Sequence, residues 1–147
     1  MSADTLTQLY QQVLLDHSRS PRNHGVLEGI EPVWGDNPLC GDRVGVYLEL
    51  VETIERITFT GHGCAICKAS ASLMTEAVQG LTREQADGLG RDFTTMLHAD
   101  DEPDPRLGDL AIFTGVRPYP TRLKCALLPW HALAAGLDGS SDTVTTE

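Results

Sequence analysis

Two adjoining segments with the alternating pattern of β-strands constrain the fold of this chain most strongly. In residues 44–51, alternate positions are apolar, which is typical of a strand with one buried face. Residues 54–60 are rich in β-branched side chains and follow the tight connection Glu52-Thr53. The pattern predicts an antiparallel hairpin whose second strand ends at Gly61 and Gly63.

Helical patterns flank this hairpin on both sides. Before it, Thr5-x-x-Gln8 resembles a capping box, and apolar residues then recur at helical spacing: Leu6, Leu9, Tyr10, Val13 and Leu14. A short edge strand is expected near residues 31–34. After the hairpin, further helices are expected from Ala65 to Gly80, from Thr82 to Leu97, at 107–114 and at 123–137. The second of these opens with Thr82-x-x-Gln85, which matches the capping-box pattern. Few strands early in the chain and helices later predict an α+β domain.

Length and charge limit the functions that this chain can have. We expect one domain over residues 1–137, followed by an acidic, disordered tail at 138–147. The formal charge is -10, with 11 Lys+Arg against 21 Asp+Glu, so we expect no nucleic-acid partner. No apolar run is long enough to cross a membrane, and the N-terminus lacks the basic region of a secretory signal. These features predict a cytoplasmic protein without a membrane partner, in a compartment where thiols stay reduced.

Four cysteines are the residues most suited to chemistry: Cys40, Cys64, Cys67 and Cys125. In a reduced chain, cysteines indicate metal or sulfur chemistry rather than a disulfide framework. Three of them lie at predicted element ends, where side chains can converge: Cys40 in a turn, Cys64 between strand and helix, and Cys125 near the start of the last helix. Asp42 follows Cys40 across Gly41. Three thiolates and one carboxylate make a complete tetrahedral ligand set for zinc.

Other interpretations remain open from the residues alone. The pair Cys64-x-x-Cys67 is compatible with a redox dithiol, with half of a zinc site, or with one functional cysteine beside a bystander. A thioredoxin-like dithiol belongs in a βαβ context, and a hairpin precedes this pair instead. Any of the cysteines could also be a small buried apolar residue. Of the five histidines, His62 lies nearest in sequence to a cysteine.

Four segments in order carry a resemblance to a known superfamily: residues 16–25, 37–42, 61–72 and 122–126, followed by Trp130. They resemble the iron–sulfur scaffold superfamily of IscU, SufU and the N-terminal domain of NifU. The resemblance runs from about Leu6 to Leu137. It implies a small antiparallel three-stranded sheet packed against several helices, with function at Cys40, Asp42, Cys64 and Cys125.

Two details resemble the SufU branch of that superfamily. Lys124 stands where scaffold members have a histidine, and the stretch between Cys64 and Cys125 is longer than in those members. The resemblance then implies zinc bound by Cys40, Asp42, Cys64 and Cys125, with Arg122 close to the metal. It also implies that Cys40 accepts persulfide sulfur from a SufS-type cysteine desulfurase and passes it to downstream iron–sulfur assembly proteins.

Two alternatives accompany this interpretation, and the role of Cys67 is open as well. One is a scaffold that assembles a [2Fe–2S] cluster, with iron in place of zinc on the same residues. Another is a zinc-stabilised binding module that stimulates no desulfurase. For Cys67, one helical turn after Cys64, the alternatives are a buried replacement for serine or a spare ligand and disulfide partner of Cys64.

Overall fold

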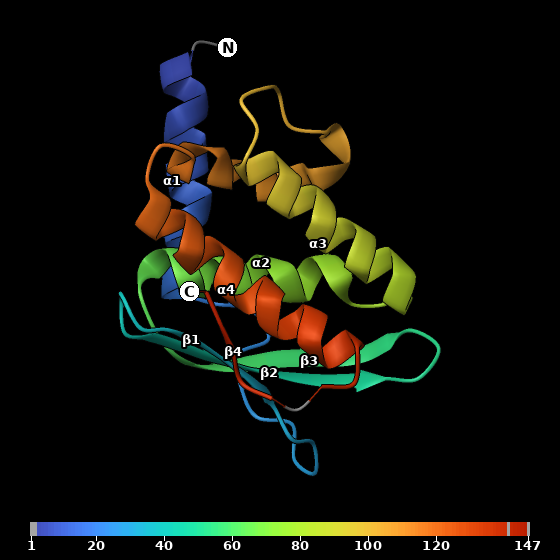
Figure 1. Ribbon diagram of the computed structural model, residues 1–147. Coiled ribbons are helices and arrows are strands. Elements are labelled where there is room, and N and C mark those ends of the chain that lie inside the picture. The colour runs from blue at the N-terminus through green and yellow to red at the C-terminus, as the bar shows by residue number, and fades with distance from the viewer. Residues whose placement is uncertain (1–2, 141, 147) are drawn as a thin grey trace.

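A computed structural model describes residues 3–140 and 142–146. As predicted, the domain is α+β, with the helices gathered on one side of a sheet (Figure 1). The helices are α1 (Ala3–Arg19), α2 (Ala65–Val78), α3 (Arg83–Leu97), the 3-10 helix η1 (Pro105–Val116) and α4 (Pro120–Leu137). Among the described residues, no helix is both long and apolar enough to span a membrane.

The sheet has the predicted antiparallel hairpin at its centre. Its strands are β1 (Val33–Asn37), β2 (Asp42–Leu50), β3 (Ile54–His62) and β4 (Val144–Thr145), in the order β3-β2-β1-β4. β1, β2 and β3 are the three expected antiparallel strands, whereas β4 pairs in parallel with β1. β4 lies within residues 138–147, where we expected a disordered tail. Val144 pairs with Gly35 because the outer edge of β1 is free to accept the short β-branched segment.

The helix boundaries show which end signals were informative. Thr82 caps α3 through a complete capping box with Gln85, as predicted. The capping box expected at Thr5 is wrong, because α1 already begins at Ala3 and Thr5 lies inside the helix. The short helix expected at 107–114 is a 3-10 helix, interrupted at Gly108 with φ of 54°. α4 begins earlier than expected, with Pro120 at its first position, where a missing backbone N–H costs nothing.

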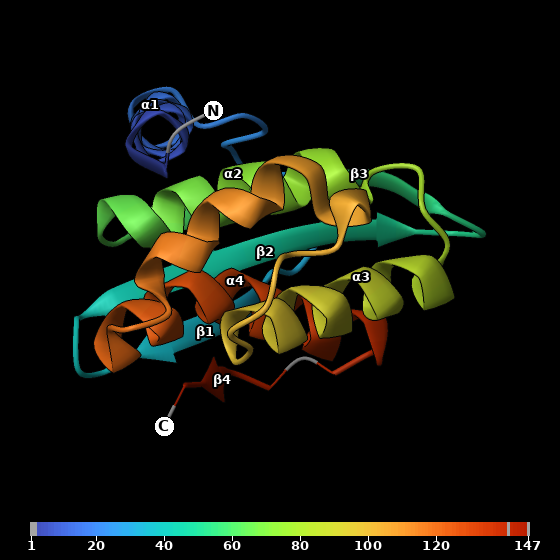
Figure 2. The same cartoon turned by 90° about the horizontal axis from the view of Figure 1, so that it is seen from above.

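The core lies between the sheet and two central helices. α2 packs on β3, and α4 packs on β1 and β2. α3 and η1 lie farther from the sheet (Figure 1), and they are therefore in front in the view from above (Figure 2). The small residues at 69–72 let α2 and α4 approach closely. The buried Ser70 hydroxyl donates to the Ala126 carbonyl at 2.5 Å and accepts from Nε1 of Trp130 at 3.2 Å. This polar bridge fixes the register of the two helices that carry the site.

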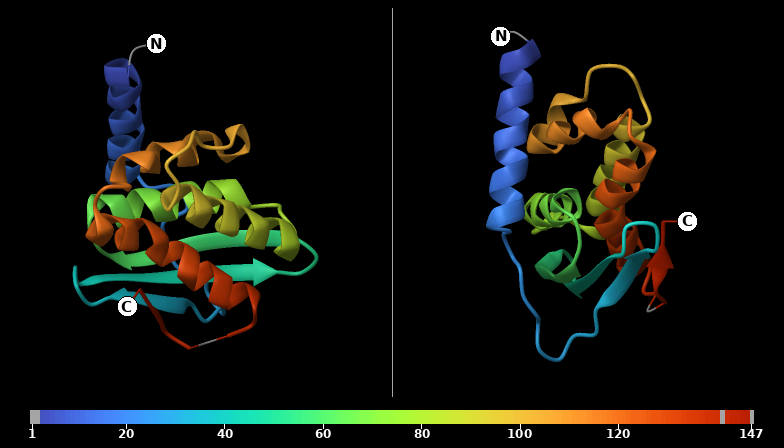
Figure 3. Two further views of the ribbon diagram at one scale, coloured as in Figure 1. Left: turned by 45° about the horizontal axis from the view of Figure 1, so that its top comes forward. Right: turned by 90° about the vertical axis from the view of Figure 1, so that its left-hand side faces the viewer.

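A buried histidine fixes the end of α1 against α2. His17 is 5% exposed, and its Nδ1 lies 2.7 Å from Oγ of Ser72. The same hydroxyl accepts the backbone N–H of Arg22 at 2.8 Å. Burial lowers the pKa of His17, so the neutral ring is favoured in the fold. The chain then continues around the sheet (Figure 3, right), where Gly25 N–H donates to the Phe59 carbonyl and covers part of the β3 edge.

Candidate metal centre

One end of the sheet brings together three chain segments that are distant in sequence. The pairing of Arg43 with His62 places the start of β2 beside the end of β3. The β1–β2 turn, the start of α2 and the start of α4 therefore lie at the same end, on the left in Figures 1 and 2. Element ends can present side chains to a common point without disturbing the core.

The β1–β2 turn presents Cys40 and Asp42. The Asn37 carbonyl accepts the N–H groups of Cys40 at 3.2 Å and Gly41 at 2.9 Å. Gly41 has φ of 71°, a left-handed conformation that glycine adopts without steric cost. The chain therefore reverses between the exposed Cys40 and the buried Asp42. One ligand atom each from Cys40, Asp42 and Cys125 lie within 4.8 Å of one another.

Cys64 lies beside this trio and is tied to it through Asp42. The Asp42 Oδ1 accepts the backbone N–H of Cys64 at 2.9 Å, and its Oδ2 lies 3.7 Å from the Cys64 sulfur. Gly63 permits this approach, since a Cβ atom on Gly63 would lie 2.9 Å from the same Oδ1. The four residues predicted as ligands thus meet at one place, with Cys64 at its margin.

The thiols of Cys64 and Cys125 have pKa values shifted in opposite directions. A hydrogen bond with Cys125 is the largest influence on Cys64 and lowers its pKa to about 7. The backbone amides of Cys67 and Ile66 at the start of α2 also favour the Cys64 thiolate, although its side chain makes no full capping hydrogen bond. The same hydrogen bond, together with burial, raises the pKa of Cys125. Cys125 thus holds its proton, and its sulfur lies 3.6 Å from that of Cys40.

The surroundings of Asp42 fit a bound cation. Asp42 is 3% exposed, and three cysteine sulfurs surround its carboxylate. Across residues 3–140 and 142–146, no arginine, lysine or histidine forms an ion pair with it. A buried carboxylate is costly without a partner of opposite charge. Three thiolates and a carboxylate are ligands that zinc accepts in tetrahedral sites.

Asn37 is a site residue that we did not predict. It is fully buried, and its Nδ2 lies 3.8 Å from the Cys125 sulfur. Its backbone carbonyl accepts the N–H groups of Cys40 and Gly41 in the turn. Its Oδ1 is buried without a hydrogen-bond partner among the described residues. The signal was its place directly before a proline, three residues ahead of Cys40, in a segment rich in turn formers.

Cys67 and His62 stand apart from the trio. Cys67 is 3% exposed, packs in the core, and its burial raises the pKa of its thiol. His62 is exposed at the end of β3. No group of three or more metal-ligand side chains found in the described part of the chain includes a histidine.

Arg122 lies on the first turn of α4, three residues before Cys125. Its guanidinium stacks over the ring of Tyr119, with 4.9 Å to the ring centroid. It also lines a cavity of about 600 Å³ between α1, η1 and the start of α2. No hydrogen bond or ion pair joins it to the four predicted ligands within the described residues.

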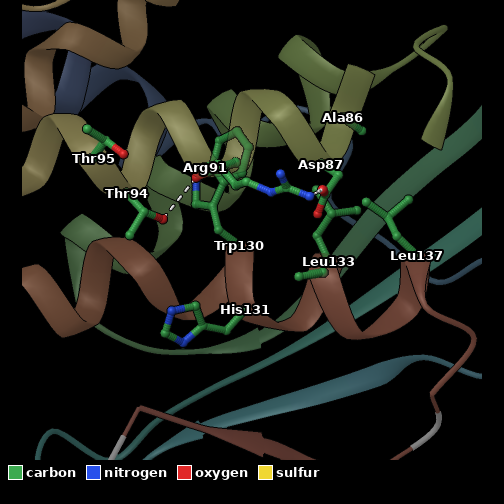
Figure 4. A pocket seen from close by; sticks show the side chains of 11 residues that line it. Ala86, Asp87, Arg91, Thr94, Thr95, Trp130, His131, Leu133 and Leu137 are labelled. Carbon is green, nitrogen blue, oxygen red and sulfur yellow. Dashed lines mark hydrogen bonds and ion pairs between the residues drawn. The ribbon is translucent and has the colours of Figure 1, made fainter. Parts of the chain in front are cut away.

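A second cavity, of about 360 Å³, lies between α3 and α4 (Figure 4). Trp130 and His131 line it from α4, and the ion-paired Asp87 and Arg91 line it from α3. No cysteine contributes to its wall. The cavity is therefore separate from the candidate metal centre.

Comparisons with known proteins show the family to which the chain belongs. The NifU-like N terminal domain family matches residues 9–126, which include all four predicted ligands. The chain is 39% identical over 144 residues to the iron-sulfur cluster assembly scaffold protein IscU of Streptococcus pyogenes serotype M1, covering 97% of this chain and 91% of that protein. It is 41% identical over 134 residues to the zinc-dependent sulfurtransferase SufU of Bacillus subtilis (strain 168), covering 90% of this chain and 91% of that protein.

Solved structures share the fold as well. The crystal structure of FiSufU, a SUF-system protein from Fervidobacterium islandicum AW-1, superimposes with a TM-score of 0.80 at 31% identity. The match covers 92% of this chain and 98% of that one. The matched length, the identities and the conserved architecture together show that this chain belongs to the NifU-like N-terminal domain family.

Proposed function

We propose that this chain is a zinc-dependent sulfur-transfer protein of iron–sulfur cluster assembly. It accepts persulfide sulfur on Cys40 from a SufS-type cysteine desulfurase and passes the sulfur to downstream assembly proteins. The observation that carries the proposal is the buried Asp42 carboxylate, which lies among cysteine sulfurs and has no ion-pair partner in the described part of the chain. The similarity to a relative named as a zinc-dependent sulfurtransferase supports the same assignment.

Cys40, Asp42, Cys64 and Cys125 would hold the metal in the resting protein. Bound zinc supplies a fixed positive charge that keeps these sulfurs as thiolates at neutral pH and has no redox chemistry of its own. Cys40 and Cys64 are both exposed, but only Cys40 lies on a turn, next to a glycine in the left-handed conformation. Asp42 and Cys125 are buried, and the Cys64 backbone is tied to Asp42. Cys40 is therefore the thiol that can move toward another protein at least cost.

The transfer step is an exchange between sulfur atoms. The Cys40 thiolate attacks the outer sulfur of the persulfide on the desulfurase cysteine. A bond forms between Cys40 Sγ and that sulfur, and the bond between the two sulfurs of the donor breaks. The electron pair leaves with the donor cysteine as a thiolate. Because free thiolates are needed on both sides, the proposal places the reaction in a reducing cytoplasm.

Arg122 would assist this encounter. It is exposed at the end of the molecule that carries Cys125, and Tyr119 already holds its guanidinium in place. On a chain with a formal charge of -10, a held cation beside the site can bind an acidic group on the desulfurase. We propose this role rather than contact with the metal.

The test mixes the full chain with a SufS-type desulfurase, cysteine and a reductant. Alanine release is followed, and zinc is measured on the same sample. The unmodified chain should accelerate alanine release, and Cys40→Ala should leave it at the rate of the desulfurase alone. Cys67→Ser is the matched control, since it changes a cysteine outside the proposed ligand set and should retain the stimulation. Full stimulation by Cys40→Ala would exclude Cys40 as the acceptor.

A scaffold for a [2Fe–2S] cluster is the second candidate, favoured by the relative named IscU at 39% identity. Lys124 in place of a histidine before the last cysteine disfavours it. The two candidates predict different metal contents. Stoichiometric zinc in a colourless protein supports sulfur transfer, whereas iron and sulfide that can be reconstituted and transferred, with visible absorption, support a scaffold.

A further inference from the structure

We propose that Cys64 and Cys67 form a reversible intramolecular disulfide, closed by reaction with a low-molecular-weight disulfide. This modification uses Cys67, which has no part in the proposed metal set. The closure itself requires neither the metal nor the sulfur-transfer reaction. Its effect on transfer, the removal of Cys64 from the site, rests on the proposed function.

The two residues have the spacing that a disulfide needs. Cys64 is the N-cap of α2 and Cys67 is the third residue of the helix. The first helical turn is closed around them, since the Lys68 N–H donates to the Cys64 carbonyl at 3.1 Å. α-Helical geometry then places their Cα atoms about 5 Å apart. Disulfides span Cα separations of about 4.4–6.8 Å, so no rearrangement of the backbone is required.

The difference in solvent exposure between Cys64 and Cys67 determines which cysteine reacts first. Cys64 is exposed, and its side chain makes no capping hydrogen bond that would have to break. Cys67 is 3% exposed, and the space beside it, between α2 and the β2–β3 hairpin, is about 10 Å³. That space holds no more than one water molecule, so an organic disulfide cannot enter it. The reagent must therefore react first at Cys64.

The disulfide forms in two successive thiol–disulfide exchanges. The Cys64 thiolate attacks one sulfur of the reagent, which forms a mixed disulfide and releases one reagent thiolate. Cys67 then loses its proton to solvent and attacks the Cys64 sulfur. The Cys64–Cys67 bond forms, and the second reagent thiolate leaves. Two cysteines are oxidised and one reagent disulfide is reduced to two thiols.

A tryptic digest isolates this pair from the rest of the site. Cleavage after Arg56 and Lys68 yields a peptide of residues 57–68 that contains Cys64 and Cys67 and no other cysteine. The full chain is incubated with oxidised glutathione, with or without a chelator, and the remaining thiols are then alkylated. In the chelator arm, this peptide should lack two hydrogens and carry no alkyl group. Treatment with a thiol reductant before alkylation should restore both alkylation sites.

Variants distinguish this pair from the competing one. Cys67→Ser should leave Cys64 as a stable mixed disulfide with glutathione, and Cys125→Ser should leave the closure intact. Cys40 and Cys125 form the rival pair, with sulfurs 3.6 Å apart. Peptide 57–68 with both cysteines alkylated in the chelator arm, with or without a Cys40–Cys125 cross-link, would overturn the proposal.

The arm without chelator tests the metal site separately. If Cys64 is a metal ligand, closure in that arm should be slower and should release zinc in step with the loss of alkylation. Equal closure rates in the two arms would support the disulfide but count against Cys64 as a ligand. The two arms thus show separately whether the disulfide forms and whether Cys64 binds the metal.

Discussion

Replacing Asp42 by alanine tests the link between the site and the fold. The substitution removes the acceptor of the Cys64 backbone N–H, a hydrogen bond of 2.9 Å to a charged group. Losing such a bond costs about 1.5–3 kcal/mol in the free energy of unfolding. At about 2.1 cal/mol/K of unfolding entropy per residue, a chain of 147 residues loses about 5–10 °C in melting temperature.

The assay is calorimetry with a chelator and then with zinc. It is run at about pH 6, below the Cys64 pKa of about 7, so that loss of the Asp42 charge does not relieve repulsion from a thiolate. Zinc at about 100 times its dissociation constant adds about 2.7 kcal/mol to the unmodified protein, or about 9 °C. An Asp42→Ala protein that binds zinc about tenfold more weakly loses about half of that rise.

Asp42→Asn is the matched control, because its amide keeps a carbonyl oxygen for the Cys64 N–H but carries no charge. With chelator it should melt within about 3 °C of the unmodified protein, while its zinc-dependent rise falls as in the alanine variant. A full zinc-dependent rise in Asp42→Asn would refute Asp42 as a ligand. An unchanged melting temperature of Asp42→Ala with chelator would refute the stabilising role of the hydrogen bond.

Three further predictions concern the packing around the site. Ser70→Ala leaves two buried polar partners without their hydroxyl and should lower the unfolding free energy by about 1–3 kcal/mol in urea, with unchanged zinc content. His17 has a pKa lowered by burial, so its contribution to stability is present above its unfolded pKa of about 6.5 and is lost as the pH falls through the lower folded value. Urea unfolding should therefore show a smaller loss between about pH 7.5 and 5 for His17→Gln than for the unmodified protein, and equal losses would contradict the role of His17. Gly63→Ala should displace Asp42 Oδ1, which would lie 2.9 Å from the new Cβ, and should weaken zinc binding in a competition titration. Gly88→Ala is its control, since nothing lies within 4 Å of that Cβ and binding should not change.

The elements that could be predicted from the sequence are those with strong local signals. The β2–β3 hairpin follows from alternation, because one face of each strand must be buried. The same Thr-x-x-Gln pattern was right at Thr82 and wrong at Thr5. Thr82 follows a break at Gly80, which adopts φ of 85°, whereas Ala3 and Asp4, directly before Thr5, already belong to the helix. β4 could not be predicted, since it depends on the free edge of a distant strand.

The site was predictable in its residue types and less so in its arrangement. Cysteines at element ends pointed to a common site, and the structure brings Cys40, Asp42 and Cys125 together. The marginal place of Cys64 depends on the close approach of Gly63 to Asp42, which no local pattern encodes. The contact of Asn37 with Cys125 likewise joins residues 88 positions apart. Only tertiary packing fixes such distances.

The central claim is that Cys40 is the residue that receives sulfur, and the direct measurement is the position of the persulfide. The desulfurase is loaded with persulfide, mixed with the full chain and removed, and the chain is alkylated and digested with trypsin. The digest separates the candidates, with Cys40 in residues 23–43, Cys64 and Cys67 in 57–68, and Cys125 in 125–147. We expect the mass of one additional sulfur atom on peptide 23–43. Additional sulfur on either of the other peptides, with none on 23–43, would contradict the claim.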